Sequence, residues 1–188
     1  MSMLIIDDNF LSAEEIEQIN KEFYRLPAIF SPLTLHVTEN RLPRPEDTYS
    51  NRFMYCSYYD HENFTHQLSL RVLDKFCSKH GISYKYVTRT RSNTTFLCDE
   101  KRPSIPHVDD YHDHLVLLYY VNDSDGDTLL YKNNYDPQQD TKMIVESSIA
   151  PKAGRAVLFT GDTYHSFHYP NKHDTRSVIN INISKDER

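Results

Sequence analysis

The sequence predicts an α+β protein in which two N-terminal helices precede seven or eight short strands, in a sandwich or barrel of jelly-roll type. Two observations predict this class. The helical patterns lie before residue 82, whereas short alternating or fully apolar runs, separated by turn residues, follow it. The content of 14 Tyr and nine Phe, with no Trp, also favours β structure.

Each helix is predicted by its periodicity and its end signals. Ser12 and Glu15 form a capping box after a short strand. Apolar residues then recur at helical spacing, at Ile16, Ile19, Phe23 and Leu26. Residues 62–81 predict a second helix, closed by Gly81. The proline-containing residues 28–52 predict a loop, either an ordinary connection or a lid over a site.

The strands are predicted after the second helix, in a single domain that spans residues 1–188. We expect residues 1–81 to form a helical support and residues 82–184 to form the β core. The run 113–122 is apolar on both faces, which is typical of a strand covered on both sides. The other strand segments are 83–96, 127–132, 142–150, 154–160, 164–170 and 176–184.

Composition makes several function classes less favoured, although it does not exclude a local basic groove. The net charge of −6 argues against nucleic-acid binding, which needs clustered Lys and Arg. The opening MSMLIIDDNF predicts neither a signal peptide nor a membrane span. The three cysteines, Cys56, Cys77 and Cys98, form no C-x-x-C pair, so we expect free thiols in a soluble, cytoplasmic protein. The oligomeric state is not readable from the sequence.

The stretch PHVDDYHDH, residues 106–114, raises the question of a metal site. Chance alone would supply one His-x-Asp triplet in this composition, so the triplet carries no weight by itself. In an extended chain, however, His107 and Asp109 point to the same face and can reach one metal. Two histidines and one carboxylate occupy one face of an octahedral iron and leave the other positions open. The second histidine must come from elsewhere, from His165, His168 or His173.

An arginine near the C-terminus bears on that choice. We expect segments 164–170 and 176–184 to pair as a hairpin, which would place His165 and Arg176 on one face and His168 on the other. On the last strand, Arg176 shares its face with Val178 and Asn180, opposite three isoleucines. An inward-facing arginine needs an anionic partner, and its planar fork suits a carboxylate.

Together these residues resemble the non-haem iron(II), 2-oxoglutarate-dependent oxygenases. Four stretches are similar to the prolyl-hydroxylase branch, which includes the hypoxia-sensing prolyl hydroxylases: IIDDNFLSAEEI, HVDDYHDHLVLLYYVN, DGDTLLY and PKAGRAVLFTGDTYHSFHYP. The resemblance spans residues 3–183 and is weak over 28–81. It implies a double-stranded β-helix (jelly-roll or cupin-like) core with the N-terminal helices packed on one sheet.

The resemblance also implies roles for individual residues. His107, Asp109 and His165 would bind Fe(II), while Arg176 and the Tyr120 hydroxyl would hold the distal carboxylate of the cosubstrate 2-oxoglutarate. With O₂, such a site hydroxylates a C–H bond and releases succinate and CO₂. A peptidyl or amino-acid substrate, prolyl by default, or a small molecule would bind beside Arg91 and Asn93, which otherwise form a solvated strand face with Arg89.

Other interpretations of these motifs stay open. His112 and His114 could join His107 in a zinc site, although Arg176 and Tyr120 would then have no role. The function could instead be that of a cupin-type metalloenzyme that does not use 2-oxoglutarate, or of a non-catalytic jelly-roll binding module. The segment NDSDGDTLLYKNN is not a calcium loop, because Gly126 falls at the wrong loop position.

Overall fold

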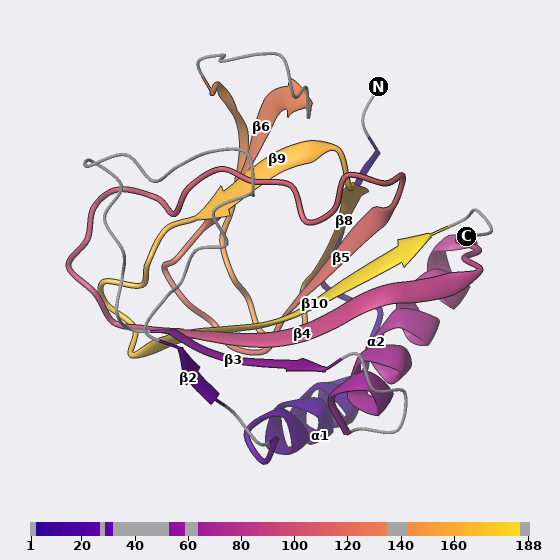
Figure 1. Ribbon diagram of the computed structural model, residues 1–188. Coiled ribbons are helices and arrows are strands. Elements are labelled where there is room, and N and C mark those ends of the chain that lie inside the picture. The colour runs from indigo at the N-terminus through magenta and orange to yellow at the C-terminus, as the bar shows by residue number, and fades with distance from the viewer. Residues whose placement is uncertain (1–2, 27–28, 32–52, 59–63, 135–142, 185–188) are drawn as a thin grey trace.

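The computed structural model describes residues 3–26, 29–31, 53–58, 64–134 and 143–184. It contains two helices and two antiparallel sheets, which confirms the predicted α+β class (Figure 1). The elements in chain order are β1 (Leu4–Asp7), α1 (Ala13–Phe23), β2 (Ile29–Ser31), β3 (Phe53–Tyr58), α2 (Phe64–His80), β4 (Tyr86–Phe96), β5 (Leu115–Tyr120), β6 (Thr128–Asn134), β7 (Val145–Ile149), β8 (Ala156–Thr160), β9 (Thr163–Phe167) and β10 (Thr175–Ser184).

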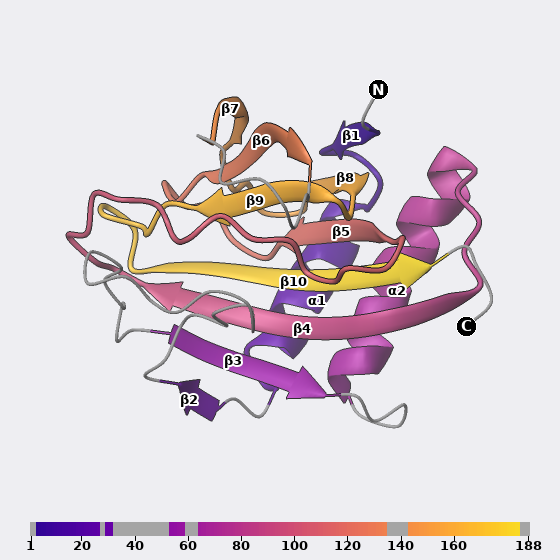
Figure 2. The same ribbon diagram turned by 45° about the horizontal axis from the view of Figure 1, so that its top comes forward.

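Seven strands form the major sheet, in the order β1-β8-β5-β10-β4-β3-β2, and three form the minor sheet, in the order β7-β6-β9. Figure 2 shows the run β5, β10, β4, β3 and β2 across the major sheet. The seven strands predicted after residue 82 are all present. Residues 1–81 contribute more than helices, because β1, β2 and β3 lie at the two edges of the major sheet. β2 also interrupts the predicted loop 28–52, and the rest of that loop, for which a lid was one of two interpretations, lies outside the described residues.

The predicted signals are present at the start of α1 and at the end of α2, whereas α1 ends at Phe23, before Leu26, and α2 begins at Phe64 rather than at residue 62. The Ser12 hydroxyl accepts a hydrogen bond from the Glu15 backbone N–H (3.2 Å), and the Glu15 carboxylate accepts one from the Ser12 backbone N–H (2.9 Å). After α2, Gly81 has a φ of 64°, a backbone conformation that favours glycine. The Ile82 N–H then donates to the Cys77 carbonyl (3.0 Å) and closes the helix end.

The core has two layers, one on each face of the major sheet (Figure 1). On one face, residues such as Leu117, Tyr119 and Ile181 pack against the helices. On the other face, residues such as Leu118 and Val178 pack against the minor sheet. All six residues of β5 are buried, as predicted for a strand that is covered on both sides. Burial of each such aliphatic side chain contributes roughly 1.5–3 kcal/mol.

Strand β10 was expected to form a hairpin with the preceding strand, and this prediction was wrong. β9 pairs with β6 in the minor sheet, whereas β10 pairs with β4 and β5 in the major sheet. The connection between β9 and β10 therefore crosses from one sheet to the other. This arrangement lets the two sheets stack and bury the apolar faces of both strands. The predicted face alternation of β10 holds, since Ile179, Ile181 and Ile183 all belong to the helix-side core.

Ion pairs tie the N-terminal strand to the rest of the domain. Asp8 accepts hydrogen bonds from Arg155 Nε (2.6 Å) and Lys152 Nζ (2.9 Å), and Asp7 contacts Lys79 and His80 of α2. Two free thiols are present among the described residues, Cys77 and Cys98. Cys77 is buried and Cys98 half-buried. In the described part of the chain, no helix is long and apolar enough to cross a membrane.

We predict that the Asp8 ion pair makes stability depend on pH. The Arg155 hydrogen bond, opposed by partial burial, lowers the pKa of Asp8 to about 2. A lowered folded-state pKa contributes stability above the unfolded-state pKa, and that stability is lost as pH falls toward 2. Asp8→Asn should therefore cost about 1–2 kcal/mol at pH 7. In urea unfolding, its deficit should shrink below pH 4. The exposed Asp162→Asn serves as the control, and a pH-independent deficit would contradict the prediction.

Candidate metal centre

Three side chains from distant parts of the sequence meet between the two sheets. Nitrogen or oxygen atoms of His107, Asp109 and His165, one from each residue, all lie within 4.8 Å of one another. The carboxylate oxygen Oδ1 of Asp109 is 4.0 Å from His107 Nε2 and 3.9 Å from His165 Nε2. The three ligating atoms therefore surround one point, as ligands of a single metal ion do.

A backbone bridge places the two histidines side by side. The His107 N–H donates to the His165 carbonyl (3.0 Å), and the His165 N–H donates to the His107 carbonyl (2.9 Å). Three residues earlier in the same loop, the Ser104 backbone N–H donates to the Phe167 carbonyl (2.8 Å), and the Ser104 hydroxyl accepts from the Phe167 N–H (3.0 Å). The loop between β4 and β5 thus runs beside β9 like an additional short strand, and the imidazole rings lie 4.5 Å apart.

The imidazoles present their Nε2 atoms to the shared point. His107 Nδ1 lies 3.0 Å from the Ile105 carbonyl, and His165 Nδ1 lies 3.3 Å from the Thr163 carbonyl. A carbonyl only accepts, so each Nδ1 carries the proton and each Nε2 keeps its lone pair for a metal. Burial, assisted by the charge of His107, lowers the pKa of His165 to about 4, which keeps that ring neutral at pH 7.

The carboxylate of Asp109 is buried but remains ionised. Burial acts to raise its pKa, whereas the positive charge of Arg89, the two neighbouring imidazoles and the Asn180 hydrogen bond lower it, and the lowering prevails. The Asp109 side chain is 4% exposed and that of His165 10%, but that of His107 is 34% exposed. Solvent therefore reaches the cluster from the His107 side.

The histidines left open as alternatives lie outside this cluster. The His112 ring pairs with Asp110 at the surface (2.8 Å), and the buried His114 ring bonds to the His112 carbonyl (2.7 Å). His168 donates its backbone N–H to Asp127, and His173 pairs with Asp125. Geometry gives no support to a zinc site with His112 and His114, because neither belongs to the group of potential ligands found among the described residues.

A second polar group lies deeper between the sheets. Arg176 is buried, and its Nε donates to the Gly126 carbonyl (2.7 Å) while Nη2 donates to the Thr128 hydroxyl (2.7 Å). The buried Tyr120 hydroxyl donates to the same Thr128 oxygen (2.6 Å). The Arg176 guanidinium also stacks on the Phe167 ring, 4.8 Å from its centroid. Both hydrogen-bond acceptors are neutral, so the arginine charge meets no carboxylate in an ion pair among the described residues.

Burial shifts the ionisation of this group. Burial lowers the pKa of Arg176, against the opposing effect of Tyr120, and burial raises the pKa of Tyr120, against the opposing charge of Arg176. The phenol thus stays protonated, and the guanidinium keeps its charge at neutral pH because arginine is not deprotonated in proteins. A buried cation beside hydroxyl groups is suited to binding an anionic group of a ligand.

The turn before β6 shapes this polar group. A Cβ atom added to Gly126 would lie 2.5 Å from the His168 carbonyl oxygen and 2.9 Å from Arg176 Cδ. Asp125 accepts hydrogen bonds from the backbone N–H groups of Asn171, Lys172 and His173 (3.2–3.3 Å). The turn is therefore clamped to the connection between β9 and β10, at the point where Arg176 enters the sheet.

The major sheet carries the two residues that were predicted to bind substrate. Arg91 pairs with Asn180, and Asn93 pairs with Val178, so both lie on the face of the sheet that carries Arg176. Arg89 was expected only on the same strand face as Arg91 and Asn93. It contacts the Asp109 carboxylate, as does Asn180. The one sequence signal for Asn180 was its strand parity with Arg176.

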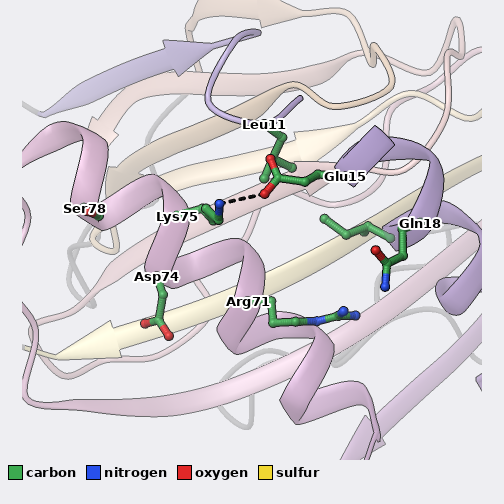
Figure 3. Close-up of a pocket in the computed structure, with 8 residues that line it drawn as sticks. Leu11, Glu15, Gln18, Arg71, Asp74, Lys75 and Ser78 are labelled. Carbon is green, nitrogen blue, oxygen red and sulfur yellow. Dashed lines mark ion pairs between the residues drawn. The ribbon is translucent and has the colours of Figure 1, made fainter. Parts of the chain in front are cut away.

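The molecule also contains a groove of about 580 Å³ between the helices, far from this chemistry (Figure 3). It lies on the helix side of the major sheet and is crossed by the Glu15–Lys75 ion pair (2.6 Å). The groove contains no member of the metal cluster. We therefore place the candidate active site between the sheets.

Comparisons with known proteins bear on the fold of the chain. No protein-family model matches the sequence, and no curated protein matches it. The solved structure of a prolyl hydroxylase from Trichoplax adhaerens, in complex with a hypoxia-inducible-factor oxygen-degradation-domain peptide fragment, is similar with a TM-score of 0.65 and 16% identity. The match covers 97% of this chain and 83% of that one.

Two further structures are similar. The non-heme alpha ketoglutarate dependent epimerase SnoN, from nogalamycin biosynthesis, has a TM-score of 0.68 at 15% identity, over 97% of this chain and 79% of that one. A Pseudomonas putida prolyl-4-hydroxylase has a TM-score of 0.61 at 12% identity, over 99% and 94% of the two chains. The chain therefore has the fold of the iron- and 2-oxoglutarate-dependent oxygenases.

Replacing Gly126 by alanine should distort the buried arginine group. The added methyl would collide with a backbone carbonyl, which cannot rotate away, so the turn must shift. We expect Gly126→Ala to lower the free energy of unfolding by about 1–3 kcal/mol, as overpacking typically does. Urea denaturation measures this loss. Stability within a few tenths of a kcal/mol of the wild type would show that the turn is not constrained.

Proposed function

We propose that the protein is an Fe(II)- and 2-oxoglutarate-dependent oxygenase that hydroxylates a C–H bond of its substrate. The observation that carries the proposal is the presence of two separate polar sites on one face of the major sheet. A cluster of two imidazoles and a carboxylate lies on the same side of the major sheet as a buried arginine. The similar folds of known oxygenases add support.

The donor set suits ferrous iron. Two histidine nitrogens and one carboxylate oxygen are the ligands of the 2-His-1-carboxylate facial triad, which leaves positions open for a cosubstrate and O₂. His107, Asp109 and His165 would hold the metal. When bound, iron with O₂ would supply the oxidative decarboxylation of 2-oxoglutarate to succinate and CO₂, coupled to hydroxylation of the substrate.

The remaining residues would bind and orient the cosubstrate. Arg176 lies four residues from Asn180 along β10, roughly 13 Å at the rise of an extended strand, and on the same face of the sheet. We propose that Arg176 pairs with the distal carboxylate of 2-oxoglutarate. The Thr128 hydroxyl accepts from both Arg176 and Tyr120, so its own proton would be available to the same carboxylate. Tyr120 would donate directly only after leaving Thr128.

The alternatives account for fewer of the observations. A cupin-type enzyme without 2-oxoglutarate needs no buried cation in the inter-sheet core. A non-catalytic binding module needs no set of three converging ligands. Burial of Arg176 without a carboxylate partner costs several kcal/mol, and an anionic cosubstrate offsets that cost.

We propose that substrate enters from the exposed side of His107 and contacts Arg91 and Asn93. Similar structures include a complex with a peptide fragment and an enzyme of nogalamycin biosynthesis, so peptides and small molecules should both be screened, with peptidyl or free proline first. We further propose a single domain with a closed double-stranded β-helix core. Free Cys77 and Cys98 support a cytoplasmic location.

The cosubstrate assignment predicts a visible metal-to-ligand charge-transfer band. Fe(II) and 2-oxoglutarate, added without oxygen, should produce the band, and admission of oxygen should then yield succinate. Arg176→Ala should weaken 2-oxoglutarate binding at least tenfold, since a charge-assisted bidentate contact is lost. Lys172→Ala, at an exposed position nearby, is the control. If the band of Arg176→Ala reaches half of its maximum at the same 2-oxoglutarate concentration as that of the wild type, this role for the arginine is excluded.

The choice of distal histidine has its own test. His165→Ala should abolish the band, because it removes one of three ligands, whereas His168→Ala should leave the band unchanged. Absorbance titration of both variants with Fe(II), at saturating 2-oxoglutarate, compares them directly. The reverse pattern would show that the metal is held by a different set of residues.

A further inference from the structure

We propose that Arg89 and Asn180 are positioning residues that hold the Asp109 carboxylate in place for the metal. The proposal rests on the metal site proposed above and adds the two residues that orient its carboxylate ligand. Arg89, on β4, contacts Oδ1 of Asp109, the oxygen that faces both imidazoles. Asn180, on the neighbouring strand β10, donates its Nδ2 to Oδ2 of Asp109 (2.8 Å).

Asp109 needs such support more than the histidines do. The backbones of His107 and His165 are bridged to each other, and both rings are bonded to carbonyl groups two residues earlier in the chain. Asp109 lies outside the regular strands, in the loop before β5. Its side-chain orientation therefore depends on Arg89 and Asn180, which engage one oxygen each.

The major sheet places the two residues side by side. β4 and β10 are paired so that Arg91 lies opposite Asn180 and Arg89 lies opposite Asn182. Arg89 and Asn180 thus approach Asp109 diagonally from adjacent strands, on one face. The Arg89 Nη1 also lies 3.5 Å from the Asp109 backbone carbonyl, so the guanidinium contacts both the side chain and the main chain.

The chemistry of each contact limits which substitutions can replace it. A carboxylate only accepts hydrogen bonds, so Asn180 must present its amide nitrogen rather than its oxygen. Arg89 supplies a positive charge and a planar fork, of which lysine keeps only the charge. Residues that orient metal ligands in this way typically change metal affinity 10–100-fold when they are removed.

The test uses Mn(II) alone, without cosubstrate or oxygen, and follows the electron paramagnetic resonance signal of free aqueous Mn(II). We expect Arg89→Met and Asn180→Leu each to weaken Mn(II) binding 10–100-fold. Arg89→Lys should recover part of the lost affinity. Arg102→Met removes an arginine that pairs with Glu100 at the surface and should bind Mn(II) as the wild type does.

A double-mutant cycle separates positioning from general destabilisation. In an Asp109→Ala background, Arg89→Met should cause no further loss of Mn(II) affinity, because the residue acts only through that carboxylate. An equal loss in both backgrounds would overturn the proposal. So would unchanged Mn(II) affinity in both Arg89→Met and Asn180→Leu. If Arg89→Met fails to fold by circular dichroism, Arg89→Lys and Asn180→Leu decide the outcome.

The same titration distinguishes failure of this proposal from failure of the metal site. If His107→Ala binds Mn(II) as tightly as the wild type, the triad is not a metal site and both proposals fall. If His107→Ala loses binding while the Arg89 and Asn180 variants retain it, the oxygenase site stands and the positioning role is wrong.

Discussion

The candidate site depends on a pair of backbone hydrogen bonds between His107 and His165. They fasten an irregular loop to the minor sheet and bring together two residues that are 58 positions apart. Because strand pairing alternates faces, a slip of one residue would turn either imidazole away from the other. The stacking of the two sheets holds this register, since Val116, Leu118 and Phe159 pack between them. Apolar packing thus determines the geometry of a polar site.

The last strand serves both layers of the molecule. One face of β10 packs isoleucines against the helices, and the other carries Arg176, Val178 and Asn180 toward the site. Burial of a charged side chain opposes folding unless hydrogen bonds offset it. Arg176 donates hydrogen bonds to the Gly126 carbonyl and the Thr128 hydroxyl, which offset part of this cost in a layer that is otherwise mainly apolar. Departures from an apolar core are expected where a protein binds a ligand.

Much of the fold could be predicted because its signals are local. The capping box at Ser12, the closing Gly81 and the alternation of β10 each depend on residues within a few positions. The prediction that β9 and β10 form a hairpin was wrong. Strands that are neighbours in sequence need not pair, and here each strand pairs within a different sheet. The edge strand β2 and its neighbour β3 were also missed, since proline and charged residues around them favour a loop.

The sequence alone determined the residue types of the site and their strand parity. It indicated His107 and Asp109 on one face, and Arg176 with Asn180 on another. Tertiary structure decided which distant histidine lies beside them. It also decided that Arg89 contacts Asp109 instead of lying on a solvated face of its strand. The physical reason is the distance along the chain over which each interaction acts. Local backbone geometry sets which way each side chain points, whereas the approach of distant segments depends on burial summed over the whole core.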